Sequence, residues 1–227
     1  MEPGPDRYLA CPQCDAAVRH QSILSGNTFG AVEWSDGLVA APMLPEQPPI
    51  VRCAGCTQYY WLRDAKEIGY FWGTEWARDE KIPPECARAP WIEEPEGGEY
   101  LQLLRDGFAK DRDEECTLRI LAWHHHNDVF RIDPDSIDVP WNRTKPSASD
   151  DAEWRKNVEA LLQLLDDRDE STILTRAEAL RQLGRFEDAI RTVKDTKWER
   201  LFAFAHQLRE WCEERDTSLR AFKTYSW

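Results

Sequence analysis

The sequence lacks the features expected of a membrane protein, a secreted protein or a common enzyme. None of its 227 residues lies in a run of 18 apolar residues, so we expect no membrane-spanning helix. The opening residues MEPGPD carry neither the basic nor the apolar region of a secretory signal. The motifs G-x-S-x-G and H-E-x-x-H are missing, as is a glycine-rich phosphate-binding loop. We therefore expect a cytoplasmic protein without membrane partners, and we identify no catalytic residue.

Basic residues are also scarce. The chain has 29 Lys and Arg against 42 Asp and Glu, which gives a formal net charge of −13. Such a charge repels the phosphate backbone of nucleic acids, so nucleic acid is the less favoured partner. Hydrophobic residues make up 41% of the chain and there are 11 tryptophans, which is too many core-forming residues for a disordered protein.

Seven cysteines are present, and four of them form two C-x-x-C pairs. The pairs are Cys11-Pro-Gln-Cys14 and Cys53-Ala-Gly-Cys56, separated by 38 residues. Two such turns can surround one ion with four thiolates, which predicts a closed, structural zinc site. Rubredoxin-type iron would use the same four cysteines, so the spacing leaves the metal open. A redox dithiol is the other alternative, but neither pair lies at a helix start in a βαβ setting.

The N-terminal third has short extended segments. The Asp36-Gly37 pair between two apolar segments predicts a β-hairpin with a type I′ turn. Four prolines then predict a surface connection, before extended structure resumes on both sides of the second cysteine pair. The extended segments are expected at 17–24, 28–34, 38–41, 50–53 and 58–62, with short helices at 64–70 and 74–80.

The rest of the chain has helical periodicity. Asp111 and Glu114 resemble a capping box between two middle helices, and Gly184 suits the end of a later helix. Apolar residues at three- and four-residue steps predict the helices themselves. We expect them at 100–108, 116–123, 150–165, 173–183, 186–193 and 196–211, with a loop at 133–150.

Two segments resemble known families. Residues 8–62, with two cysteine turns around a hairpin, resemble a zinc ribbon. Residues 171–195 resemble one tetratricopeptide-type (TPR) repeat, on the basis of the stretch RAEALRQLGRFEDAI, in which Ala177 and Ala189 take the small positions where paired helices approach. The usual aromatic residues and the closing proline are missing. The layout as a whole is similar to uncharacterised bacterial proteins, which implies no activity.

The expected fold is therefore α+β. It begins with a small β zinc ribbon and continues as an antiparallel array of helical hairpins that is TPR-like at the C-terminus. The expected domains are 1–90 for the ribbon and its trailing short helices, 91–150 for a helical hairpin and a proline-rich connector, and 151–227 for the TPR-like helices.

Candidate partner-binding residues are aromatic and basic. Trp61, Trp72 and Trp76 follow the second cysteine pair, and Arg181 and Arg185 lie on the TPR-like helices. Tryptophan dominates binding energy at many interfaces. The alternative is that the aromatics build the core that joins ribbon to helices, and that the arginines form a solvated face.

These observations favour a non-catalytic, zinc-stabilised adaptor or accessory subunit of a larger bacterial assembly, with another protein as its partner. One alternative is a zinc ribbon that binds nucleic acid. Another is an enzyme subunit whose active site forms only with its partner. The run His124–His126 is an unassigned feature, since neighbouring residues of a helix point about 100° apart and cannot all bind one metal. Cys86, Cys116 and Cys212 have no activating neighbours and are expected to be buried.

Overall fold

The chain divides into two compact units. The structure is a computed structural model of the whole chain and describes residues 1–72, 82–131, 148–166, 170–194 and 199–222. One unit, here the β unit, consists of Met1–Ala31 and Ala40–Pro95. The other, here the helical unit, consists of Val32–Val39 and Glu96–Trp227. Whether the three domains expected from sequence fold separately stays a prediction.

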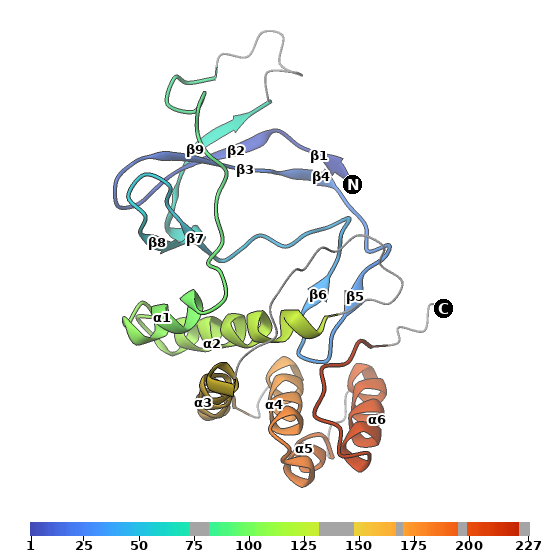
Figure 1. Cartoon of the computed structure of the whole chain (residues 1–227). Coiled ribbons are helices and arrows are strands. Elements are labelled where there is room, and N and C mark those ends of the chain that lie inside the picture. Colours follow the sequence, from blue (N-terminus) through green and yellow to red (C-terminus); the bar gives the residue numbers. More distant parts are fainter. Residues whose placement is uncertain (73–81, 132–147, 167–169, 195–198, 223–227) are drawn as a thin grey trace. The chain divides into compact units, whose positions relative to one another are not determined.

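The β unit is built on small antiparallel sheets, as the α+β expectation requires. Its main sheet has the order β3-β2-β9, and β2 pairs antiparallel with both neighbours (Figure 1). A second sheet pairs β7 with β8, and a third pairs β1 with β4. The strands are β1 (Glu2–Pro3), β2 (Asp6–Ala10), β3 (Ala17–His20), β4 (Ile23–Ser25), β7 (Ile50–Arg52), β8 (Tyr59–Trp61) and β9 (Lys66–Phe71).

The segment after β8 corrects one sequence expectation. A helix was expected at 64–70, but a short 3-10 helix (η1, Leu62–Asp64) leads into strand β9. The strand forms because β2 has a free edge there, and pairing satisfies the backbone groups of both strands. Ile68 also packs against the cluster around Tyr8. The helix expected at 74–80 lies outside the described residues.

Alternate residues of β2 face opposite sides of the main sheet. Leu9 lies in a buried cluster on one side, and Tyr8 lies in a second cluster with Cys86 and Ala89. The first cluster contains two of the paired cysteines and the central residue of each strand of the β7–β8 hairpin. Its buried members are Leu9, Cys11, Val18, Val51, Cys53, Tyr60 and Leu62. This apolar core is small, which leaves the β unit dependent on other stabilisation.

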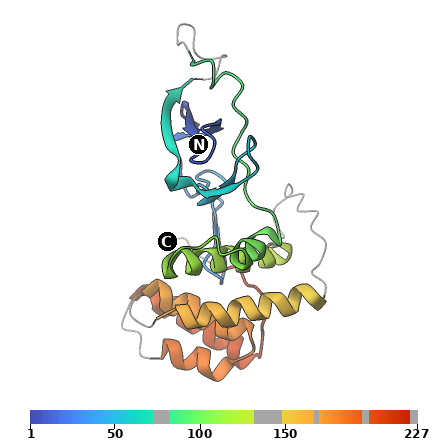
Figure 2. The ribbon, with the colours of Figure 1, turned by 90° about the vertical axis from the view of Figure 1, so that its left-hand side faces the viewer.

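The helical unit contains six α-helices among its described residues. Helix α1 packs on α2, α2 on α3, α3 on α4, α4 on both α5 and α6, and α5 on α6 (Figure 2). A 3-10 helix, η2 (Asp128–Phe130), follows α2. The α-helices are α1 (Glu99–Arg105), α2 (Arg112–Asn127), α3 (Ala148–Leu164), α4 (Glu170–Gln182), α5 (Phe186–Val193) and α6 (Glu199–Glu213).

The helical periodicity predicted these helices correctly. Most of the apolar residues expected to face inward do so, since Leu161, Leu180 and Leu208 are buried in one continuous core. Phe202, in the apolar stripe of α6, is an exception with 69% of its surface exposed. Gly184 ends α4 with φ +77°, and its N–H donates to the carbonyl of Arg181 while that of Arg185 donates to Leu180. This is the left-handed ending expected from sequence. Asp111 caps α2, since its side chain accepts the N–H of Glu114 at 2.9 Å.

The hairpin predicted from Asp36-Gly37 exists but belongs to the helical unit. Its strands, β5 (Val32–Glu33) and β6 (Val39–Ala40), are shorter than expected. The turn is also not type I′, because Gly37 alone in the loop has positive φ and its N–H donates to the carbonyl of Trp34. The loop Ser35–Gly37 instead fits a three-residue hairpin with glycine in the left-handed position. On its other edge, β5 meets the C-terminal segment, where Phe222 N–H donates to Glu33.

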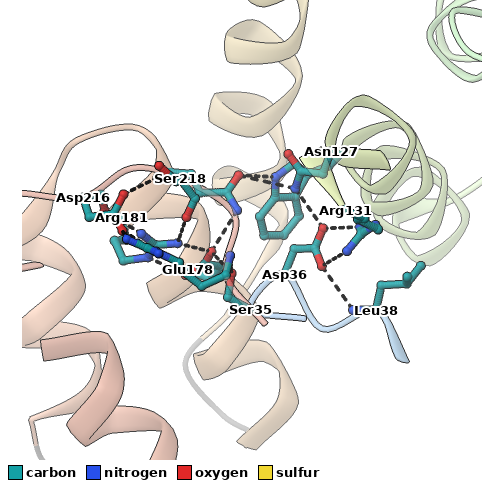
Figure 3. A network of polar contacts seen from close by, with 12 residues as sticks. Ser35, Asp36, Leu38, Asn127, Arg131, Glu178, Arg181, Asp216 and Ser218 are labelled. Atoms are coloured by element: carbon teal, nitrogen blue, oxygen red, sulfur yellow. Dashed lines mark hydrogen bonds and ion pairs between the residues drawn. The ribbon is translucent and has the colours of Figure 1, made fainter. Parts of the chain in front are cut away.

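Ser35, at the hairpin tip, enters a buried polar network (Figure 3). Its hydroxyl donates to Glu178 at 2.6 Å, and the same carboxylate accepts from Arg181 at 2.7 Å. Both charged side chains are fully buried. Arg181 also donates to the carbonyl of Ser218 at 2.7 Å, so the network joins α4 and the C-terminal segment to the hairpin.

Asp36 forms the second part of the network. Its carboxylate accepts from Arg131 at 3.1 Å and from Asn127 at 2.8 Å. The Asp36 side chain is 0% exposed and that of Arg131 is 8% exposed. Burial opposes ionisation, but His124, Arg131 and Asn127 together hold the pKa of Asp36 below its usual value. The hairpin is therefore held in the helical unit by a buried ion pair.

We predict that Asp36→Asn lowers the free energy of unfolding of the helical unit by about 3 kcal/mol, because it leaves the buried Arg131 guanidinium with a neutral partner at this position. Chemical denaturation followed by far-ultraviolet circular dichroism measures this change. The matched control is Asp188→Asn, whose carboxylate pairs with Arg185 and Arg191 at the surface. Its cost should stay below about 1 kcal/mol.

The pH dependence provides a second check on Asp36. A carboxyl whose folded pKa is lowered stabilises the protein above its unfolded pKa, and this contribution disappears as the pH falls through the folded pKa. The stability difference between the unsubstituted protein and Asp36→Asn should therefore shrink in acid below about pH 4. A difference that stays constant down to acid unfolding would contradict the ion-pair assignment.

Candidate metal centre

Cys11 and Cys14 lie in a tight turn that directly follows β2. Cys11 N–H donates to Ala16 at 3.0 Å, Asp15 N–H donates to Cys11 at 3.0 Å, and Gln13 N–H points at the Cys11 sulfur at 3.5 Å. Asp15 closes the turn with φ +56°. A non-glycine residue adopts this left-handed conformation only where the surrounding contacts hold it there.

Cys53 and Cys56 repeat this geometry after β7. Cys53 N–H donates to Gln58 at 2.9 Å, Thr57 N–H donates to Cys53 at 2.8 Å, and Gly55 N–H points at the Cys53 sulfur at 3.3 Å. Thr57 takes the place of Asp15, with φ +61°. Two turns of the same form, from opposite ends of a 38-residue insertion, thus face each other.

The four sulfurs converge. All four Sγ atoms lie within 4.8 Å of one another, with Cys11 and Cys56 3.9 Å apart and Cys14 and Cys53 3.6 Å apart. Sulfurs placed tetrahedrally at about 2.3 Å from a zinc ion are separated by about 3.8 Å. The residues therefore fit a tetrahedral metal ion, and Cys11, Cys14, Cys53 and Cys56 would hold it. No other such group of His, Cys, Asp or Glu occurs in the part of the chain that the structure describes.

Gly55 allows the two turns to come this close. A Cβ atom at Gly55 would lie 2.9 Å from the Cβ of Ala16, which is shorter than real Cβ contacts. It would also meet the sulfurs of Cys14 and Cys53 at 3.6 Å. The glycine at the third position of the second turn is thus required by the contact with the first turn.

The electrostatics of the cluster favour a cation. Burial raises the pKa of Cys53, but backbone N–H groups of Cys56 and Gly55 and the thiols of Cys11 and Cys14 lower it to about 7. The Ala16 N–H lowers the pKa of Cys14, but desolvation and the three other cysteines raise it to about 12. Because neighbouring thiolates repel each other, all four ionise together only with a positive ion between them.

Burial differs between the members of each pair. Cys11 and Cys53, the first cysteine of each turn, are buried, whereas Cys14 is exposed and Cys56 is partly exposed. Four thiolates complete the coordination of a tetrahedral ion, so no position remains for a substrate or an activated water. An ion held here stabilises the fold and has no catalytic position.

The predicted partner-binding residues are only partly at the surface. Trp61 and Arg181 are buried, with 3% and 0% of their surface exposed, so their assignment to an exposed surface is wrong. Trp61 packs inside the β unit, and Arg181 is held by Glu178. Trp72 is exposed by 37%, and the Arg185 side chain is exposed by 53%. Trp76 lies outside the described residues.

The three neighbouring histidines have three different partners. His124 Nε2 forms a hydrogen bond with the carbonyl of Asp36 at 3.0 Å, His125 Nδ1 lies 3.4 Å from Asp128, and the His126 ring stacks on Trp154. They do not form a metal site. Cys86 and Cys212 are buried, as expected, and Cys116 is partly buried. Burial is the largest cause of the raised pKa of each of these three thiols, which makes them poor nucleophiles.

Sequence reasoning missed the ionic network of the helical unit. The sequence pattern predicts Asp36 only as a turn residue and Glu178 only as part of the TPR-like stretch. The sequence around Asp36 gives no signal of its burial, because a carboxylate in a hairpin turn is normally solvated.

Comparisons with protein families, with curated proteins and with solved structures found no match to this chain. Within the described residues, no helix combines the length and the apolar character needed to cross a lipid bilayer. The metal centre therefore stands on its own geometry.

We predict that Gly55→Ala weakens metal binding about 10- to 100-fold, the range seen when groups supporting metal ligands are disturbed. The added Cβ pushes the second turn away from Ala16 and opens the sulfur cluster. Competition with a zinc chelator measures the affinity. Ala16→Gly in the same chain should restore most of it, and Gly98→Ala, where a Cβ meets no atom within 4 Å, should have no effect. Equal affinity in all variants would contradict this account of the site.

Proposed function

We propose that this protein is a non-catalytic interaction module whose β unit is held together by one structural zinc ion. It would act as an adaptor or accessory subunit of a larger bacterial assembly, with another protein as its partner. The observation that carries the proposal is the closed four-sulfur cluster, which provides a complete ligand set for one ion and leaves no open coordination position.

The choice of zinc over iron rests on chemistry and context. Both ions accept four thiolates in a tetrahedron. An electron carrier would need no large helical body, whereas a structural zinc ion commonly stabilises a small β unit with a thin core. Two C-x-x-C pairs in a chain with an odd number of cysteines fit a metal site of a reducing compartment better than a disulfide framework, which supports the proposed cytoplasmic location.

Exposed apolar side chains support a protein partner. Phe29 is 82% exposed, Leu24 is 59% exposed and Phe202 on α6 is 69% exposed. Large apolar groups at the surface are typical of binding sites when they gather in patches. In the helical unit, Ala177 and Ala189 are fully buried where α4 packs on α5, as the proposed TPR-like helix pair requires.

The nucleic-acid alternative has weaker support. Several arginines of the β unit are already paired with carboxylates, including Arg7 with Glu67, Arg19 with Asp6 and Arg63 with Asp64. Paired arginines add little positive potential for a phosphate backbone. The observations therefore favour a protein partner over nucleic acid.

We predict one zinc ion per chain, and we expect its removal to loosen the β unit alone. Zinc binding contributes on the order of 10 kcal/mol to the folding of small zinc-bound units. Elemental analysis gives the metal and its ratio to protein, and hydrogen–deuterium exchange after chelation shows which strands open. Exchange should rise in β2, β3, β7 and β8 and stay unchanged in α2 and α4.

Two cysteine variants separate metal loss from general damage. Cys14→Ser should reproduce the exchange pattern of the chelated protein, whereas Cys116→Ser, outside the cluster, should keep its metal. Purified protein without metal that keeps full protection in all four strands would contradict a structural metal. Stoichiometric iron would correct the identity of the ion and leave the structural role in place.

We also predict that photo-crosslinking in the source organism captures discrete partners at exposed apolar positions. A photoreactive phenylalanine analogue at position 29 or 202 should form a defined crosslinked species, and the same analogue replacing exposed Glu159 should not. Crosslinks from position 29 should be lost in Cys14→Ser. Equal crosslinking at all three positions, or a substrate turnover abolished by one substitution outside the cysteines, would contradict an interaction module.

A further inference from the structure

A cleft of about 460 Å³ opens on the β unit, away from the four cysteines. It lies between the β3–β4 segment, the loop at 44–48 and the extended segment at 91–94. The residues that decide its chemistry are His20, Ile23, Leu44, Glu46, Trp91 and Glu94. The metal site and the core do not account for this cleft.

The walls of the cleft are fixed by backbone contacts. The extended segment runs beside β3, with Arg19 N–H donating to Pro90 at 2.8 Å and Ile92 N–H donating to Arg19 at 3.0 Å. Glu93 accepts the N–H of Arg52 at 2.8 Å, which attaches the same segment to β7. A preformed site loses less conformational entropy on binding than a flexible one.

The start of the loop at 44–48 is held by backbone contacts as well. Leu44 N–H donates to Ala41 at 2.9 Å, and the loop backbone lies so close to Gly26 that a Cβ there would be 2.4 Å from the Met43 carbonyl oxygen. Pro45 and Pro48 restrict the backbone further. Leu44 is thereby held at the surface with 43% of its area exposed.

One side of the cleft is apolar. Trp91 is 46% exposed, and Leu44 and Ile23 lie with it in the lining. The guanidinium of Arg19 lies 4.0 Å from the centre of the Trp91 ring and so occupies one face of it. This stacking restricts the indole ring, and Arg19 is paired in turn with Asp6 at 3.8 Å.

The other feature of the cleft is negative charge. Glu46 and Glu94 are both exposed at its edge. Burial and the nearby Arg7 lower the pKa of His20, so this ring is neutral near pH 7. Among the described residues that line the cleft, none is Lys or Arg. An apolar wall with two carboxylates at its edge is complementary to a ligand that is both apolar and basic.

We propose that this cleft binds an extended, basic peptide segment of the partner protein, with an apolar side chain against Leu44 and Trp91 and a Lys or Arg facing Glu46 and Glu94. The proposal rests on the interaction function proposed above and names the chemistry of its partner. A peptide fits better than a small polyamine because one wall of the cleft is apolar, with Leu44 and Trp91 43% and 46% exposed, and only a ligand with apolar side chains covers it. A polyamine would leave this surface uncovered.

Selection from a phage library of random dodecapeptides against the full, metal-loaded chain tests the proposal. We expect enrichment of peptides that have Lys or Arg close to Leu, Ile, Phe or Trp. These peptides should bind more weakly at high salt, because charge attraction contributes to their binding. Enrichment of acidic or purely apolar sequences, or no enrichment at all, overturns it. Binding of spermidine that displaces the selected peptides at similar affinity overturns the choice of a peptide.

Charge-reversal variants locate the bound peptide. Glu46→Lys with Glu94→Lys should weaken the selected peptide at least about tenfold, because two attractions become repulsions. Glu85→Lys makes the same type of charge change at an exposed position of the β unit outside the cleft and should have little effect. Leu44→Ala should weaken binding, and Tyr70→Ala, which removes a similarly exposed side chain (46% against 43%) outside the cleft, should not.

The variants also separate the two proposals. Selected peptides that bind all variants equally place the binding surface elsewhere, which overturns the cleft and leaves the interaction module in place. If crosslinking at positions 29 and 202 finds no partner as well, the interaction function itself fails. Fluorescence anisotropy of a labelled peptide measures each affinity, and metal content confirms that every variant is folded.

Discussion

The β unit depends on four sulfur atoms that converge on one point. Cys11 and Cys14 come from the end of β2, and Cys53 and Cys56 come from the end of β7, so the site closes a loop of 38 residues. Closing a flexible loop of this length costs several kcal/mol of chain entropy, which the small apolar cluster around Leu9 must otherwise offset. The local backbone is adapted to the same end, since Asp15 and Thr57 both adopt positive φ and Gly55 lacks the side chain that would separate the turns.

The two cysteine pairs are separated by an unusually long loop. It is longer than in most four-cysteine sites because it contains the hairpin at 32–39, which is part of the helical unit. There the hairpin is fixed by the buried Trp34 and by polar contacts, through Asp36 with Arg131 and Ser35 with Glu178. A buried ion pair is a weak source of stability but a strict requirement on position, since a shifted hairpin would separate the buried Asp36 carboxylate from Arg131. The network therefore specifies where the hairpin lies more than it strengthens the unit.

Features with a short-range cause could be predicted from the sequence. The C-x-x-C pairs, the Asp111 cap, the Gly184 ending and most of the apolar stripes of α3 to α6 each follow from residues a few positions apart, and the structure contains them. The failures have long-range causes. Strand β9 forms because β2 offers an edge some 60 positions earlier, and Arg181 is buried because Glu178 and the carbonyl of Ser218 receive its charge. The cleft beside Trp91 is likewise invisible in sequence, because it needs three segments that only the fold brings together.

The contacts of the basic residues indicate which kind of partner the charge of the chain favours. Arg131 and Arg181 are used inside the helical unit, and Arg7, Arg19 and Arg63 are paired with carboxylates in the β unit. The remaining carboxylates are in excess, since the chain carries 42 acidic and 29 basic residues. A partner that approaches this surface therefore meets a negative field over long range and apolar side chains only at contact. Charge attraction thus favours a basic partner when the two proteins first meet, and apolar contact stabilises the final complex. The cleft beside Trp91 offers carboxylates and an apolar wall within one site.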